Sequence, residues 1–174
     1  MRKVFVAISY GQGGVAVDSL LSGGGIDRLH SRIKALGADA PSPFGWHQYQ
    51  EIADRIKKLP SDTRVAVGGA SLGANMAPWI GASVGGRTID FMFGIQPSLY
   101  GGKYPVTNNV KRALCIYNPI WFITMGFGAH WWPRSGGNLA TAMTYQRTYA
   151  GHPGDNLDSV QNPIIAAVKK LQES

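Results

Sequence analysis

The stretch Gly69-Ala70-Ser71-Leu72-Gly73 decides the fold that we expect for this chain. It has the pattern G-x-S-x-G and lies between an apolar run at 64–67, typical of a buried strand, and a helical stretch through 76–80. In that context the serine sits on a tight turn that lifts its hydroxyl clear of the sheet, and the helix N-terminus favours a developing oxyanion. The pattern therefore predicts Ser71 as a nucleophile. The alternative is a glycine-rich turn in which Ser71 only caps the helix.

Strands and helices alternate along the rest of the chain. Besides the strand at 64–67, we expect strands at 4–8, 38–44 (short), 89–95, 111–117 and 139–149. We expect helices at 26–36, at 46–59 and directly after Ser71. A last helix is expected with Asn162 as its cap and Pro163 at its first position. This order predicts an α/β three-layer sandwich, with a mostly parallel sheet of five to six strands, as one domain over 1–174. Sites in such sheets lie at the carboxyl ends of the strands, which groups the loops at 10–14, at 68–73 and after 149.

Composition restricts the class of protein. Of the 174 residues 44% are hydrophobic and 16% charged, as is typical of a globule with a well-buried sheet. The formal charge is +7, from lysines and arginines scattered along the chain, which indicates a solvated surface or, alternatively, attraction to an anionic surface or polymer. Basic residues do not interleave with aromatic ones in a stripe, so we expect no nucleic-acid partner.

Cysteine content and hydropathy address the compartment. Cys115 is the only cysteine, which excludes an intrachain disulfide. The apolar run Val4–Ile8 is too short for a signal peptide, and no run approaches the roughly 20 apolar residues of a membrane span. We therefore expect a cytoplasmic protein without a stable membrane span.

From Val4 to Leu171 the chain resembles a minimal member of the α/β-hydrolase superfamily, of the small lipase- or esterase-like kind found in bacteria and phages. The resemblance rests on the glycine turn after the first strand, the G-x-S-x-G pattern, the Ile95-Gln96-Pro97 loop, the run 109–112 before the next strand, and a histidine after the last strand. Only the pattern around Ser71 and its order relative to that histidine are specific. The resemblance implies hydrolysis of small-molecule or lipid-like carboxylic esters through an acyl-enzyme on Ser71, with no cofactor and no metal.

By that resemblance, the general base is His152, in the run 151–154. His30 falls inside one expected helix and His47 starts another. His130 belongs to an aromatic loop and is a second choice. His152 alone follows the last strand and precedes the last helix, where the fold returns the base to the nucleophile.

The oxyanion hole needs two backbone donors. The amide of Leu72 is the first candidate, and the second comes from Gln12-Gly13, where glycine permits the required dihedral angles. The alternative for 11–14 is a simple turn.

The third member of the triad is where the pattern departs from the family. Relatives carry a carboxylate after one of the two strands that follow the nucleophile, and here those positions hold the neutral Gln96 and Asn118. Asp90 falls inside an expected strand, whereas Asp155 and Asp158 follow the histidine and are candidates to orient it. An amide neither fixes the imidazole tautomer reliably nor stabilises the imidazolium. The departure therefore leaves a second interpretation open, a catalytically impaired hydrolase-fold protein with a binding or structural role.

An aromatic segment at 119–138 follows Asn118. It holds Trp121, Phe122, Trp131 and Trp132 among glycines, and a loop so long and aromatic is usually functional or heavily packed. We interpret it as the apolar wall of an acyl pocket, with two alternatives: a surface for a partner or lipid, and a flap that shields the sheet edge.

Overall fold

The computed structural model describes residues 2–16, 24–98, 105–117, 132–133, 142–148 and 154–174. The expected base His152, the amide Asn118, and Trp121, Phe122 and Trp131 lie outside the described residues. For Trp132 the structure describes the backbone, which lies in a short strand, and not the side chain.

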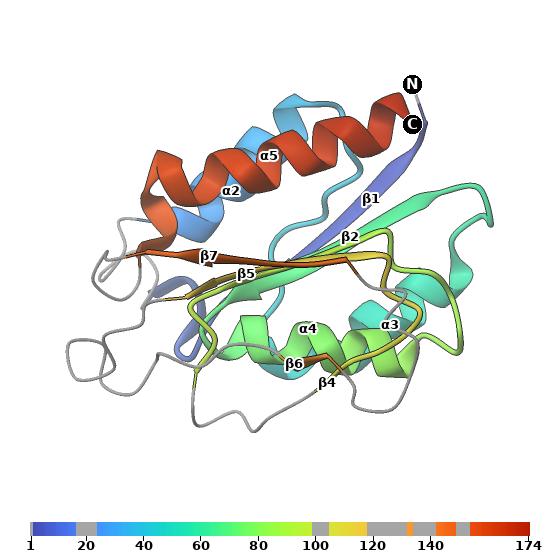
Figure 1. Ribbon diagram of the computed structural model, residues 1–174, viewed down its shortest axis with the longest axis horizontal. Coiled ribbons are helices and arrows are strands. Elements are labelled where there is room, and N and C mark those ends of the chain that lie inside the picture. The colour runs from blue at the N-terminus through green and yellow to red at the C-terminus, as the bar shows by residue number, and fades with distance from the viewer. Residues whose placement is uncertain (1, 17–23, 99–104, 118–131, 134–141, 149–153) are drawn as a thin grey trace.

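A five-stranded sheet forms the centre of the protein (Figure 1). Its strands, in spatial order, are β1 (Val4–Ser9), β2 (Arg64–Ala70), β3 (Phe91–Ile95), β5 (Arg112–Tyr117) and β7 (Ala142–Arg147). Every neighbouring pair is parallel, so all five strands end at one edge of the sheet. The expected parallel sheet of five to six strands is confirmed. A separate pair, β4 (Pro105–Val106) and β6 (Trp132–Pro133), is also parallel.

Helices cover both faces of the sheet (Figure 1). On one face lie α2 (Gly25–Ala35) and α5 (Asp158–Glu173), and on the other lie α3 (Tyr49–Lys58) and α4 (Leu72–Ser83). In the described part of the chain, we find no helix with both the length and the apolar character that crossing a bilayer requires.

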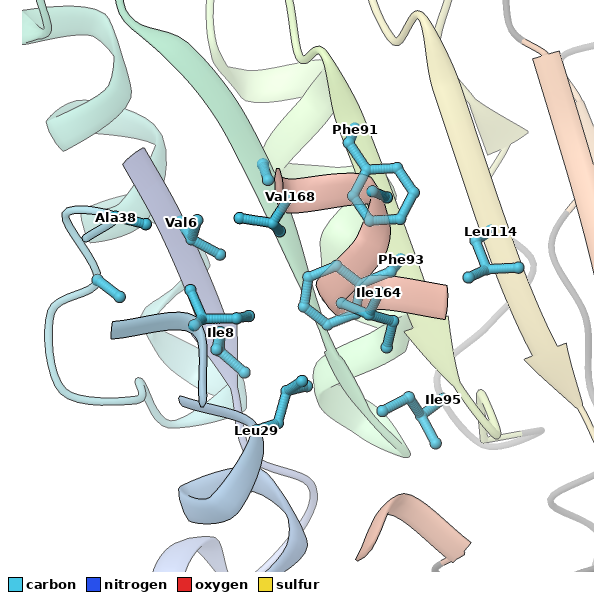
Figure 2. Close-up of a cluster of buried hydrophobic side chains, with 14 of the residues drawn as sticks. Val6, Ile8, Leu29, Ala38, Phe91, Phe93, Ile95, Leu114, Ile164 and Val168 are labelled. Atoms are coloured by element: carbon cyan, nitrogen blue, oxygen red, sulfur yellow. The ribbon is translucent and has the colours of Figure 1, made fainter. Parts of the chain in front are cut away.

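The hydrophobic core is divided between the two faces by the alternation of side chains along each strand. In β1, Val6 and Ile8 point to the α2/α5 face, whereas Phe5 and Ala7 point to the α3/α4 face. Figure 2 shows the first cluster, in which side chains of β1, β3 and β5 meet Leu29 of α2 and two residues of α5. Strands buried on both faces read as continuous apolar runs, which is why they were recognisable in the sequence.

The last helix begins earlier than the sequence indicates. The expected start at Asn162 and Pro163 is wrong, because α5 begins at Asp158 and holds Pro163 in its interior. A proline there leaves the carbonyl four residues earlier, on Ser159, without its helical donor. The side-chain amide of Gln146 in β7 donates to that carbonyl at 2.9 Å. A neighbouring strand thus replaces the missing hydrogen bond.

Three other expected elements also differ. The short strand at 38–44 is reduced to isolated bridges from Asp39 and Phe44 to β1, and the helix over 46–59 is divided into the 3-10 turn η1 (Trp46–Gln48) and α3. The strand expected at 89–95 begins at Phe91, so Asp90 precedes β3 instead of lying inside it.

We predict that Gly68→Ala destabilises the protein more than Gly85→Ala. A Cβ on Gly68 would lie 2.3 Å from the Phe93 carbonyl oxygen, and we expect the free energy of unfolding to fall by about 2–3 kcal/mol. A Cβ on Gly85 meets nothing within 4 Å, so only its φ of +63° opposes the change, at about 1 kcal/mol. Urea denaturation of both variants measures the difference. Equal stabilities would contradict the close approach of β2 and β3.

Candidate active site

Ser71 occupies the turn between β2 and α4 in a strained backbone conformation. Its φ is 53° and its ψ is −122°, a region that residues other than glycine rarely adopt. Its amide donates to the carbonyl of Ile95 at 2.9 Å, which fastens the turn to the end of β3. Ser71 is the N-cap residue of α4, but its side chain makes no capping hydrogen bond. The hydroxyl is therefore not engaged by the helix, contrary to the alternative that it serves only as a cap.

Glycines beside Ser71 allow three elements to meet. A Cβ on either Gly69 or Gly73 would lie 2.4 Å from the carbonyl oxygen of Ser9, at the end of β1. A Cβ on Gly11 would lie 2.9 Å from the Cβ of Ser71 and 3.5 Å from its Oγ. The glycine turn after β1 consequently lies directly against Ser71. The structure brings together two of the three loops that the sequence groups at this edge.

The proposed oxyanion donors follow directly after the two residues that approach each other here: Leu72 follows Ser71, and Gln12 and Gly13 follow Gly11. Leu72 is the first residue of α4, where backbone amides have no partner within the helix. Gln12 and Gly13 form an exposed turn, and Gly13 has a φ of +86°. Glycine adopts such a positive φ without steric cost, as the sequence predicts for this turn.

Gln96 follows β3, the strand next to β2. It is fully buried, and its φ of 46° makes it a second strained residue at this edge. Its amide donates to the carbonyl of Ile116 in β5 at 2.6 Å. Two adjacent strands are thus each followed directly by a residue other than glycine with positive φ, a form of strain that clusters at functional sites.

Two of the candidate carboxylates are engaged away from Ser71. Asp90 lies at the opposite edge of the sheet, where Arg64 and Lys111 each donate to it at 3.0 Å. Asp158 is exposed at the start of α5 and accepts from Arg28 at 2.7 Å and from Arg32 at 3.3 Å. Neither is placed to orient a base beside Ser71.

Asp155 is buried, as Asp90 is, whereas Asp158 is exposed. It lies in the 3-10 turn η3 (Gly154–Asn156), and a Cβ on Gly25 would lie 2.6 Å from its Oδ1. Gly25 begins α2, and the hydroxyl of Tyr10, just beyond β1, donates to Asp27 in the same turn of α2. Asp155 therefore lies on the side of the sheet where the strands end.

Asn75 is a buried polar residue that the sequence analysis did not single out. It lies on α4 one turn after Ser71, and its side-chain amide forms two hydrogen bonds with the backbone of Ser98, at 2.6 Å and 2.7 Å. These bonds fix the loop of Gln96 and Pro97 against the helix of Ser71. The only sequence signal is an asparagine on a helix that is otherwise apolar.

Among the described residues no group of three or more histidine, cysteine, aspartate or glutamate side chains is close enough together to hold a metal ion.

Comparisons with known proteins agree with the architecture. No protein-family model and no curated protein matches the chain. A solved structure from Xanthomonas campestris pv. campestris, described as a "putative hydrolase of the alpha/beta superfamily", is similar with a TM-score of 0.57. The two are 14% identical, and the match covers 99% of each chain. The likeness shows that this chain has the fold of that superfamily protein.

We predict that Asn75→Ala loosens the loop after β3. The change removes both hydrogen bonds between the Asn75 side chain and the buried backbone of Ser98, so we expect a loss of about 2–3 kcal/mol in the free energy of unfolding. Asn108→Ala is the matched control, because Asn108 is exposed and its replacement should change stability by less than about 0.5 kcal/mol. Urea denaturation checks both values, and similar midpoints for the two variants would contradict the role given to Asn75.

Proposed function

We propose that this protein is a serine hydrolase of carboxylic esters that acts through an acyl-enzyme on Ser71. One observation carries the proposal: Ser71 is held at positive φ on a strand-to-helix turn, its hydroxyl makes no capping hydrogen bond to the helix, and it lies beside the glycine turn after β1. Such a turn places a serine hydroxyl at the N-terminus of a helix, where an oxyanion is favoured.

His152 is the proposed base. It stands between the end of β7 at Arg147 and the buried Gly154. Both flanking elements lie at the edge of the sheet where Ser71 lies, which supports the assignment. His152 also follows Ser71 in the chain and comes after the last strand, which is the order found in the hydrolases that the sequence resembles.

The reaction follows from these groups. Ser71 Oγ attacks the ester carbonyl carbon while His152 accepts the hydroxyl proton. The amide of Leu72 and one amide of Gln12 or Gly13 donate to the oxyanion. His152 then gives the proton to the leaving alkoxide. In the second half of the reaction His152 accepts a proton from water, the water oxygen attacks the acyl carbon, and the proton passes to Ser71 Oγ as the carboxylic acid leaves. No cofactor is required.

The third position of the triad has two candidates. Gln96 takes the position that the resemblance gives to a carboxylate, and a neutral amide does not offset the charge of an imidazolium. Asp155 is the rival, because it is buried at the correct edge of the sheet, three residues after His152. Its contact with the start of α2 also fits a purely structural role, in which a carboxylate interacts favourably with the positive end of a helix.

A second candidate function follows from Gln96. A fully buried amide at the acid position favours a catalytically impaired protein that uses the hydrolase fold for binding or for structure. For the enzyme, the proposed substrates are small-molecule or lipid-like esters. The residues Trp121, Phe122, Trp131 and Trp132 are proposed to contact the acyl chain.

We predict that a fluorophosphonate probe labels Ser71. Intact protein should gain one probe mass by mass spectrometry, and Ser71→Ala should abolish the gain, because the probe reacts only with an activated serine. Ser31→Ala removes an exposed serine on α2 and should label as the wild type does. Folded protein that does not react would support the binding or structural alternative.

We predict that a carboxylate at position 96 raises ester hydrolysis. In a well-studied triad the change from aspartate to its amide lowered turnover by about 10⁴. Gln96→Asp and Gln96→Glu should therefore raise kcat by roughly 10-fold or more, a barrier change of about 1.4 kcal/mol. Two lengths are needed because the shorter side chain reaches less far.

The rival acid is tested in the same assay. Asp155→Asn should leave activity within about threefold of the wild type if Gln96 holds the acid position, a barrier change of less than 1 kcal/mol. Asp158→Asn is the matched control: it makes the same change at an exposed side chain and should leave activity unchanged. Loss of activity in Asp155→Asn alone, with no gain at position 96, would assign the acid to Asp155.

A further inference from the structure

A cleft of about 450 Å³ lies at the edge of the sheet opposite Ser71. Arg2 precedes β1, Arg64 begins β2, Asp90 precedes β3 and Lys111 precedes β5, and all four line it. Because the strands are parallel, these residues share the edge where the strands begin, whereas Ser71 lies where they end. We call this space the amino-edge cleft, and we propose that it binds the phosphate group of a small soluble molecule.

Charge supports an anionic ligand. The lining holds four cationic side chains, from Arg2, Arg64, Arg87 and Lys111, against the two carboxylates of Asp62 and Asp90, which leaves a surplus of two positive charges. A phosphate group carries between one and two negative charges near neutral pH. The remaining lining residues are serine, threonine and glycine, so the walls offer polar contacts.

Two sets of hydrogen bonds hold three of the four cationic side chains, those of Arg64, Lys111 and Arg87. The Asp90 carboxylate accepts from Arg64, Lys111 and the amide of Val65, each at 3.0 Å. Arg87 donates through one guanidinium nitrogen, Nη2, to the carbonyls of Pro60 at 2.6 Å and Thr63 at 3.0 Å. Side chains that are already ordered lose less conformational entropy when a ligand binds.

Hydrogen-bond donors remain available after these contacts. Within the described part of the chain, the Arg2 guanidinium and the hydroxyls of Ser61 and Thr88 make no hydrogen bond, and Lys111 uses one of its three N–H groups. Arg87 keeps its other guanidinium nitrogens. A phosphate presents several strong acceptor oxygens and no carbon surface, and it therefore matches an excess of charged donors.

Calorimetric titration with inorganic phosphate, against chloride at constant ionic strength, tests the proposal. We expect saturable binding at one site in the wild type. Arg2→Gln and Lys111→Gln should each raise Kd by about 10-fold, since each removes one charge-assisted contact. Arg2→Gln is the safer variant because its side chain contributes no hydrogen bond to the described fold, and thermal melting verifies that both variants are folded.

Arg147→Gln is the matched control. It removes the same charge at the end of β7, far from the cleft along the strand direction, and should change Kd by less than about twofold because the solvent screens distant charges. Equal weakening in Arg147→Gln and Arg2→Gln would indicate diffuse attraction to the net charge and overturn the proposal. Absence of saturable phosphate binding would also overturn the proposal. A third contradicting result is a protein that does not bind free phosphate but cosediments with phosphatidate vesicles, because the ligand would then be a lipid surface. Ester hydrolysis by Arg2→Gln should match the wild type, so failure of either proposal is distinguishable.

Discussion

The close approach of the Ser9 carbonyl to Gly69 and Gly73 is the constraint on which the rest of the structure depends. A Cβ at either glycine would lie 2.4 Å from that oxygen. Because neither residue has a side chain, β1, β2 and the start of α4 can approach one another closely here, and Ser71, in the turn between β2 and α4, has a positive φ. The same approach sets Gly11 against Ser71, so a packing requirement also creates the geometry of the candidate site.

The two edges of the sheet have opposite characters. Where the strands end, the turn residues Ser71 and Gln96 are neutral, buried and strained. Where the strands begin, charged side chains gather around the buried Asp90. Parallel strands separate the two groups by the length of the strands, so the proposed chemistry at one edge and the proposed anion binding at the other can be tested independently.

Asn75 shows how the candidate site depends on a residue that takes no part in the proposed chemistry. Its two hydrogen bonds to Ser98 hold the loop that contains Gln96. The strained backbone of Gln96 is in turn fastened to β5 through Ile116. The backbone of Gln96, at the proposed acid position, is therefore held by its own hydrogen bond to Ile116 and by those of Ser98, so a carboxylate introduced there would start from a fixed backbone position.

By itself the sequence determined the order of elements, the parallel sheet and the turn at Ser71, because strand alternation, helix periodicity and the G-x-S-x-G pattern are local signals. It did not locate the start of α5, since the Ser159 carbonyl that Pro163 leaves open is satisfied by Gln146 from another strand. Nor did it separate Asp155 from Asp158, which are three residues apart but differ in burial and in the residues that they contact. Burial and hydrogen bonding between distant segments exist only once the chain has folded, so the tertiary structure alone decided them.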